Sequence, residues 1–119
     1  MGITQLIGNY GEEKACALLK KKKYRILARN YACRLGELDI VAAKDEFVVF
    51  VEVKARSAET HGCPREFVTP KKQQRVLKAA QHFLLHYGLE DRQPRFDVIE
   101  VYLNDKKHMV AIKHLENAF

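Results

Sequence analysis

The chain has 119 residues, of which 47% are hydrophobic and 30% are charged, so we expect residues 1–119 to form a single soluble domain with a buried core. It has no apolar run close to the roughly 20 residues of a membrane-spanning helix, and its first residues lack the pattern of a signal peptide. We therefore expect a cytoplasmic protein without a membrane partner. The formal net charge of +6 is compatible with a nucleic-acid partner, although many basic proteins bind none.

The first half of the chain predicts one helix and three strands. Apolar residues recur at helical spacing over residues 3–22, and the lysines that close this stretch suit a helix C-terminus. Segments rich in β-branched and aromatic residues predict strands at 24–30, 37–43 and 47–55. A polar turn at 44–46 separates the last two strands, which are expected to form a hairpin.

The second half predicts a loop, a helix and two strands. Residues 57–65 contain glycine and proline and are expected to form a loop. A Thr-Pro pair at 69–70 is a typical helix start, and this helix is expected to end just before Gly88. Strands are predicted at 95–103 and 108–115.

The order of these elements, α-β-β-β-α-β-β, defines the expected fold. The fold class is α/β (mixed α+β), with a central mixed sheet of about five strands flanked by two main helices. The helix between the third and fourth strands fits a parallel, right-handed crossover.

Two acids are expected to face each other in the predicted hairpin. A tight turn at 44–46 places Asp39 opposite Glu52, and Glu37 opposite Lys54. Lys54 points to the same side as Glu52 because side chains alternate along a strand. Opposed carboxylates repel, and a divalent cation such as Mg²⁺ relieves the repulsion by accepting their oxygens. The pattern therefore predicts a metal site with Asp39 and Glu52 as ligands and Lys54 beside the attacking water.

A third acid comes from the first helix. Glu12 shares a helical face with the apolar Cys16 and Leu19, so its carboxylate is expected either at the core boundary or directed into the site. Glu13 is the alternative, but its helical neighbours are more polar. We therefore assign the third catalytic acid to Glu12.

The same spacing also has a purely structural explanation. An Asp followed on the next strand by Glu-x-Lys is a loose pattern that arises often by chance. Glu52 and Lys54 would then be an exposed pair on an edge strand, and Glu37 with Lys54 a cross-strand salt bridge. The apolar neighbours of Glu52 favour the metal site, because a buried charge usually has a partner or a metal.

Several segments resemble a known bacterial family. They are, in chain order, GNYGEEKACALLKKKKYRILARNY, GELDIVA, VVFVEVKARS, VTPKKQQRV and RFDVIEV. On these segments, which run from about Gly8 to Val101, the chain is identified as a member of the YraN-like family, which is described as endonuclease-like. This family is related to Holliday-junction resolvases and to the wider restriction-endonuclease-like superfamily. The resemblance implies a restriction-endonuclease-like fold with a metal site of the PD-(D/E)xK type.

The resemblance also implies roles for individual residues. Asp39 in GELDIVA matches the metal-binding aspartate, and Glu52 and Lys54 in VEVK match the E-x-K pair. Glu12 matches the acid on the first helix. Leu38 replaces the proline that precedes the aspartate in the superfamily pattern, which leaves the acid itself in place.

Basic residues around the second helix are candidate nucleic-acid contacts. Lys71, Arg75 and Lys78 share one helix face that could follow phosphates, with a solvated helix face as the alternative. The resemblance implies a basic residue at the start of this helix, which is Lys72, with Lys71 as the alternative. Arg56 closely follows the E-x-K pair and is expected to lie near the site.

Neither disulfides nor a zinc site are expected. The cysteines Cys16, Cys33 and Cys63 are odd in number and form no C-x-x-C motif. Cys16 lies among apolar residues and is expected to be buried. His82 and His86 have half of a zinc-binding spacing, and no glutamate lies between them.

These patterns together predict an endonuclease that requires Mg²⁺ or Mn²⁺ and hydrolyses nucleic-acid phosphodiesters. DNA is the expected partner, and branched or structured DNA is a candidate substrate. The main alternative is a non-catalytic nucleic-acid-binding module on the same scaffold, and the third is a protein-interaction domain. Related resolvases act as dimers, so a homodimer is a further expectation, although no sequence feature identifies its surface.

Overall fold

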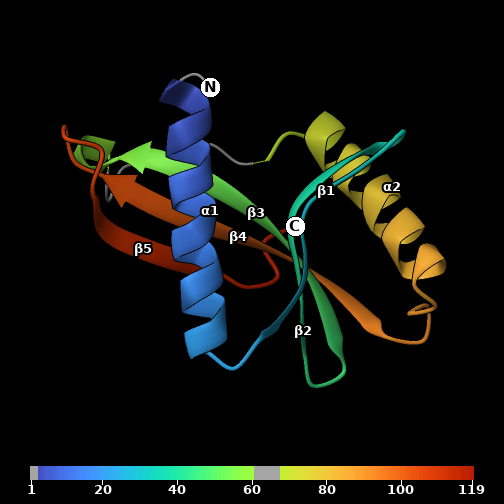
Figure 1. The fold of residues 1–119 in the computed structure, drawn as a ribbon. Coiled ribbons are helices and arrows are strands. Elements are labelled where there is room, and N and C mark those ends of the chain that lie inside the picture. The colour runs from blue at the N-terminus through green and yellow to red at the C-terminus, as the bar shows by residue number, and fades with distance from the viewer. Residues whose placement is uncertain (1–2, 61–67) are drawn as a thin grey trace.

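A computed structural model describes residues 3–60 and 68–119, and these residues form the predicted order of helices and strands (Figure 1). The elements are α1 (Ile3–Lys21), β1 (Arg25–Cys33), β2 (Gly36–Lys44), β3 (Phe47–Ser57), the short 3-10 helix η1 (Ala58–Thr60), α2 (Pro70–His86), β4 (Gln93–Leu103) and β5 (Met109–Leu115). Residues 61–65 of the expected loop, and with them Cys63, lie outside the described residues. No helix in the described ranges is long and apolar enough to cross a membrane.

The strands form one mixed sheet in the order β1-β2-β3-β4-β5. β3 and β4 are parallel, whereas the other neighbouring pairs of these strands are antiparallel. The parallel pair is joined through α2, because parallel neighbours require a crossover connection. The predicted fold class, α/β with a mixed sheet and two main helices, is confirmed, and the arrangement is consistent with a restriction-endonuclease-like fold.

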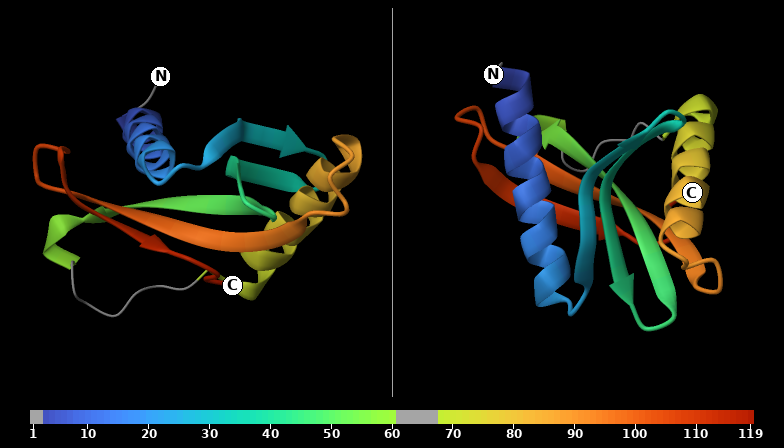
Figure 2. Two further views of the ribbon diagram at one scale, coloured as in Figure 1. Left: turned by 90° about the horizontal axis from the view of Figure 1, so that it is seen from below. Right: turned by 45° about the vertical axis from the view of Figure 1, so that its right-hand side comes forward.

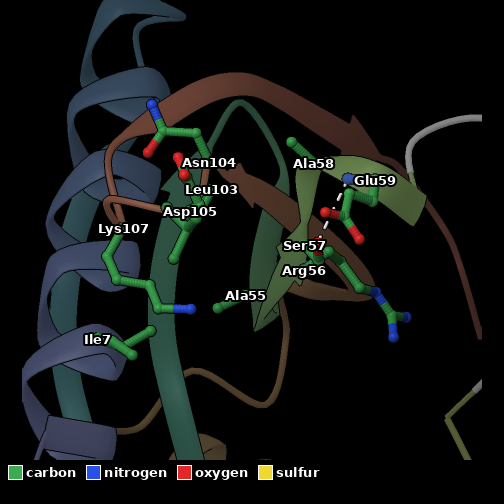
Figure 3. A pocket seen from close by; sticks show the side chains of 10 residues that line it. All are labelled: Ile7, Ala55, Arg56, Ser57, Ala58, Glu59, Leu103, Asn104, Asp105 and Lys107. Atoms are coloured by element: carbon green, nitrogen blue, oxygen red, sulfur yellow. Dashed lines mark hydrogen bonds between the residues drawn. The ribbon is translucent and has the colours of Figure 1, made fainter.

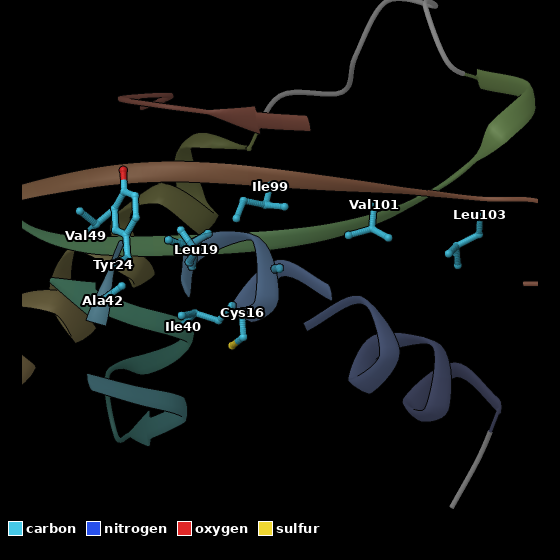
Figure 4. Close-up of a cluster of buried hydrophobic side chains, with 11 residues drawn as sticks. Cys16, Leu19, Tyr24, Ile40, Ala42, Val49, Ile99, Val101 and Leu103 are labelled. Carbon is cyan, nitrogen blue, oxygen red and sulfur yellow. The ribbon is translucent and has the colours of Figure 1, made fainter. Parts of the chain in front are cut away.

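The two helices cover opposite faces of the sheet (Figure 2). α1 packs Cys16 and Leu19 into a cluster that includes Val51 of β3. Figure 4 shows Cys16 and Leu19 in this cluster beside Ile40 and Ile99. α2 packs Phe83 against Phe50, the neighbour of Val51, with ring centroids 6.1 Å apart. Neighbouring strand residues point to opposite faces, so β3 supports both halves of the core. The predicted burial of Cys16 is confirmed, since only 5% of it is exposed.

α2 begins at the predicted Thr-Pro pair. Oγ1 of Thr69 accepts a hydrogen bond from the backbone N–H of Lys72 at 3.2 Å, which satisfies a donor that the helix itself leaves unpaired. Pro70 occupies the first turn, where its missing N–H costs nothing. Beyond the helix, Gly88 has a φ of 65°, a left-handed conformation that glycine adopts without strain. This start places Lys72, in the first turn of the helix, close to Glu52 of β3.

β2 pairs with β3 along only part of its length. The antiparallel ladder runs from Lys44 opposite Phe47 to Ile40 opposite Val51, and it ends there. Beyond this point the two strands diverge, as Figure 1 shows. We call the region between the diverging strands, from Ile40 back to Gly36 on β2 and from Val51 on to Ser57 on β3, the fork.

The fork corrects one detail of the predicted hairpin. The register is the predicted one, but Asp39 with Glu52 and Glu37 with Lys54 are not ladder pairs, because the ladder stops before them. On the other side of β2, Asn30 of β1 has a φ of 52° and is not a ladder partner of Asp39, whereas the register shift between β1 and β2 lies at Ile26 and Ala28. Asp39 is therefore outside the ladders that β2 forms with both of its neighbouring strands.

Candidate metal and nucleic-acid site

Asp39 lies in the fork and bridges the two strands with its side chain. Oδ2 of Asp39 accepts a hydrogen bond from the backbone N–H of Val53 at 2.9 Å. The carboxylate therefore supplies the acceptor that backbone pairing no longer supplies at this position. The bond ties the orientation of the Asp39 carboxylate to the backbone of β3.

Glu52 lies beside Asp39 and is almost completely buried, with 3% of the residue exposed. Burial, followed by the negative charge of Asp39 and a hydrogen bond with its carboxyl group, raises the pKa of Glu52 to about 7. The charges of Lys72 and Lys54 act in the opposite direction and lower this pKa. Asp39 and Glu52 are therefore close together, as predicted, although they meet in the fork and are not paired in the β2–β3 ladder.

Two lysines supply the positive charge near Glu52. Nζ of Lys72, on the first turn of α2, lies 3.6 Å from Oε2 of Glu52. Lys54 follows Glu52 by two residues on β3 and so points to the same face of the sheet. The sequence left Lys71 and Lys72 as alternatives at the start of α2, and Lys72 is the one that contacts the acid pair.

Glu12 approaches Asp39 from α1. Burial raises the pKa of Glu12, a hydrogen bond with Asn30 lowers it, and the charge of Asp39 raises it again. Nη2 of Arg29 lies 3.7 Å from Oε1 of Glu12, which is too long for a hydrogen bond. Oε1 is buried and accepts no hydrogen bond from the described residues. A buried oxygen of this kind marks a place where a cation or a polar ligand atom would fit.

The donor set of the fork fits a hard divalent cation. Glu12, Asp39 and Glu52 offer only carboxylate oxygens, which Mg²⁺ and Mn²⁺ prefer over sulfur or imidazole ligands. The three carboxylates do not converge on one point, since they are not among the described groups whose ligand atoms all lie within 4.8 Å of one another. Asp39 and Glu52 are therefore the residues that would hold the ion directly, with Glu12 at a greater distance.

Arg29 and Asn30 belong to the site but were missed by the sequence analysis. Both lie on β1 beside Glu12, and both lower its pKa. Asn30 was predicted to end a strand, and no local pattern distinguished it from other polar residues. The left-handed φ of 52° at Asn30 is visible only in the structure. Asparagine tolerates this conformation better than most residues do.

Apart from Lys72, which lies against Glu52, the predicted nucleic-acid residues separate into two groups. Arg56 donates a hydrogen bond from Nε to Oε2 of the buried Glu100 at 3.2 Å, and only 19% of its side chain is exposed. Lys71, Arg75 and Lys78 are exposed along α2. Arg56 therefore has an internal partner, whereas the three α2 residues present their charges to solvent.

One hollow is lined in part by the end of β3, and a second is lined in part by the start of β2. The larger, of about 620 Å³, lies where the ends of α1 and β3 meet η1 and the β4–β5 turn (Figure 3). In it the backbone N–H of Glu59 donates to Oγ of Ser57 at 3.3 Å, and none of the three acids lines it. The second hollow, of about 480 Å³, lies between the β1–β2 turn and α2 and is lined in part by Lys72 and Arg75. The second hollow is the one linked to the acids, through Lys72.

A second acidic cluster contains its own cation. One oxygen or nitrogen atom from each of Asp97, His114 and Glu116 lies within 4.8 Å of the others. Nη2 of Arg95 is 2.8 Å from Oδ2 of Asp97 and 3.3 Å from Oε1 of Glu116. The guanidinium thus forms an ion pair with each of the two carboxylates, so this cluster already has a cationic partner from the protein itself.

Comparison with known proteins matches residues 11–101 to the model of a family described as "Uncharacterised protein family UPF0102". A UPF0102 protein from Alkaliphilus oremlandii is 50% identical over 119 aligned residues, covering 98% of this chain and 100% of the relative. The chain belongs to the UPF0102 family. The resemblance to the YraN-like family is thereby confirmed.

Other UPF0102 proteins match over nearly their whole length. The relative from Moorella thermoacetica is 45% identical, with 94% of this chain and 93% of the relative covered. The relative from Caldicellulosiruptor saccharolyticus is 44% identical, with 95% of this chain and 96% of the relative covered. The UPF0102 match includes Glu12, Asp39, Glu52 and Lys54, so the whole fork lies inside the family region.

Proposed function

We propose that this UPF0102 protein is a nuclease that uses Mg²⁺ or Mn²⁺ to hydrolyse phosphodiester bonds, with DNA as the substrate to test first. The observation that carries the proposal is the contact between Asp39 and Glu52 in the fork, where the pKa of Glu52 is raised to about 7. Two neighbouring carboxyl groups repel each other when both are ionised, and a bound divalent cation relieves this repulsion. Such a pair is therefore a suitable ligand set for Mg²⁺ or Mn²⁺. Perturbed carboxyl groups of this kind are enriched at functional sites.

Each residue of the fork has a role that follows from its position. Asp39 and Glu52 would hold the ion, and the backbone N–H of Val53 keeps the Asp39 carboxylate in a fixed orientation. A bound divalent ion would supply the Lewis acid that polarises the phosphodiester and favours ionisation of the attacking water. Lys54, on the same face as Glu52, is placed to orient that water or to offset negative charge that develops on the phosphate.

Glu12 and Lys72 support the acid pair from the two helices. The buried Oε1 of Glu12 is placed to accept a proton or a hydrogen bond from a water in the fork. Lys72 lies 3.6 Å from Glu52 and limits the repulsion between the carboxylates before an ion enters.

The same lysine favours a second candidate function. Because Lys72 partly compensates Glu52 without any metal, the scaffold could be retained as a nucleic-acid-binding module that does not cleave. In that case the exposed α2 cations would bind phosphates and the acids would serve only the fold.

Cleavage assays with matched glutamate variants separate the two functions. Purified protein with Mg²⁺ or Mn²⁺ is expected to nick a panel of single-stranded, duplex and branched DNA, and Glu52→Gln is expected to abolish nicking without abolishing binding. Glu46→Gln is the control, because Glu46 is exposed in the turn of the same hairpin. Wild-type protein that binds DNA but nicks none of these substrates with either metal would be a binding module.

A further inference from the structure

One face of α2 carries cations along its first half and imidazole rings along its second half. Lys71, Arg75, Lys78, His82 and His86 recur at spacings of three and four residues, so they share one face, and all five are exposed. α2 has 17 residues and is therefore about 25 Å long. We call this continuous row of side chains the α2 stripe.

The rings at the end of the α2 stripe are held by one another and by the core. His82 and His86 stack with centroids 6.0 Å apart and an angle of 9° between their planes. Tyr87, which is 54% exposed, meets the ring of His86 edge-on at 4.8 Å. From β1, the hydroxyl of Tyr31 lies 2.6 Å from Nδ1 of His82. Beneath them, buried Phe83 contacts both tyrosine rings at 5.1 and 4.6 Å. These contacts restrict the rings, which lowers the entropy cost of stacking a ligand on them.

The cationic half of the α2 stripe borders the hollow of about 480 Å³ described above. Arg34, Lys72 and Arg75 bring three positive charges to its lining, and Glu37 brings one negative charge, so the charged residues of the lining leave an excess of two positive charges. The turn rests directly on the helix, since a Cβ on Gly36 would lie 2.8 Å from the carbonyl oxygen of Arg75. Lys72 also contacts Glu52, so the hollow leads from the α2 stripe to the fork.

We propose that the α2 stripe and this hollow bind a single-stranded segment of nucleic acid, with phosphates on the cations and unpaired bases on the rings. The proposal rests on the proposed function, because it names the form of substrate that would lead into the fork. Cations spaced along one surface follow a phosphate backbone. Exposed tyrosine and histidine rings stack unpaired bases, as many single-strand binding proteins do. The bases of a duplex are stacked inside it, so a duplex would contact the cations through its phosphates but would offer no unpaired base to stack on the rings.

Binding measurements without metal test the proposal independently of cleavage. Fluorescence anisotropy in EDTA would compare a labelled oligothymidine with a duplex of the same length. We expect Tyr87→Ala and His86→Ala each to weaken oligothymidine binding about five-fold or more and to leave duplex binding unchanged. The double variant Arg75→Gln/Lys78→Gln is expected to weaken binding of both probes and to reduce its dependence on salt.

Matched variants control for the fold and for general surface effects. Tyr87→Phe keeps the ring and is expected to bind as the wild type does. Leu85→Ala removes an apolar side chain that is 68% exposed on the same helix, and it is expected to change neither affinity. Thermal unfolding followed by circular dichroism verifies that each variant is folded.

The outcomes distinguish this proposal from the proposed function. Ring-dependent binding of oligothymidine by a protein that cleaves nothing would support the single-strand site and reject the nuclease. Cleavage that persists while the ring variants bind oligothymidine like the wild type would reject the single-strand site and keep the nuclease. If light scattering shows a dimer that Tyr87→Ala dissociates, with oligothymidine affinity unchanged, the ring cluster joins two copies of the chain and the proposal is wrong.

Discussion

The Oδ2 atom of Asp39 accepts a hydrogen bond from the backbone N–H of Val53 at 2.9 Å, and these residues lie one and two positions beyond the last ladder pair, Ile40 and Val51. The side chain thus takes over a bond that a regular hairpin would assign to the backbone. Asp39 consequently serves the fold as well as the proposed chemistry. Variants of Asp39 that differ in hydrogen-bonding capacity separate these two roles.

Asp39→Asn and Asp39→Ala should differ in stability but not in activity. The amide oxygen of Asn can still accept the Val53 N–H, whereas Ala leaves this part-buried donor without its partner, at a cost of about 1–3 kcal/mol. Urea unfolding in EDTA would measure the difference. Both variants should lose metal-dependent nicking, because neither offers a carboxylate. Equal stability of the two variants would mean that the bond to Val53 contributes nothing.

Glu52→Gln is expected to be more stable than the wild type at high pH when no divalent metal is present. The folded-state pKa of Glu52 is raised from 4.5 to about 7, so ionisation is resisted in the folded protein and not in the unfolded chain. The wild type therefore loses stability as the pH rises from about 4.5 to about 7, and the difference stays constant above that range. The glutamine variant avoids this loss, which amounts to a few kcal/mol at most.

Urea unfolding at pH 5 and pH 8 in EDTA measures the effect of Glu52→Gln. Glu46→Gln, a change of the same kind at an exposed position, should show no such pH dependence. Addition of Mg²⁺ or Mn²⁺ at pH 8 should raise the unfolding midpoint of the wild type and leave that of Glu52→Gln unchanged. A metal response of equal size in both proteins would count against Glu52 as a ligand.

Asp97→Asn is expected to destabilise the protein by about 3–5 kcal/mol at neutral pH, because it leaves the Arg95 guanidinium without its buried counter-charge. The oxygens of Asp97 accept bonds from Arg95 at 2.8 and 3.0 Å and from the backbone of Asn117 at 2.9 Å, and His114 lies at 2.7 Å. Chemical unfolding at neutral pH measures the change. Asp105→Asn, in the exposed β4–β5 turn, is the control.

The same network predicts an acid-dependent loss of stability. Burial by itself raises the pKa of Asp97, but the bonds from His114, Arg95 and the backbone of Asn117 outweigh it and lower the pKa below its ordinary value. The stabilisation is therefore fully present above the ordinary carboxyl pKa near 4 and is lost as the pH falls through the lower folded-state value. The difference between wild type and Asp97→Asn should shrink in that acidic range, and a constant difference would contradict the assignment.

Gly36→Ala and Gly8→Ala are expected to have opposite effects. A Cβ on Gly36 would lie 2.8 Å from the backbone oxygen of Arg75, so the β1–β2 turn must move away from α2, at a cost of about 1–3 kcal/mol. A Cβ on Gly8, inside α1, meets no atom within 4 Å, and alanine should stabilise the helix by about 0.5–1 kcal/mol. Thermal unfolding of both variants tests the pair, and a stable Gly36→Ala protein would show that the contact is loose.

Local patterns were sufficient to predict the elements of the fold. The helical spacing of α1, the Thr-Pro start of α2 and the apolar run of β3 are properties of neighbouring residues, and each led to the correct element. The alternation along β3 also placed Glu52 and Lys54 on one face. The sequence by itself therefore determined the fold class, the family and the acids and lysine that the site brings close together.

The tertiary structure decided where pairing stops and which distant residues meet. The point at which the β2–β3 ladder ends and the choice of Lys72 over Lys71 depend on how separate strands and helices pack together. The left-handed φ of Asn30 is also visible only in the folded chain. Arg56 likewise turned to Glu100, a partner that its neighbours in sequence do not indicate. Short-range periodicity specifies the face on which a side chain lies, but only the packing of separate elements determines the atoms that it contacts there.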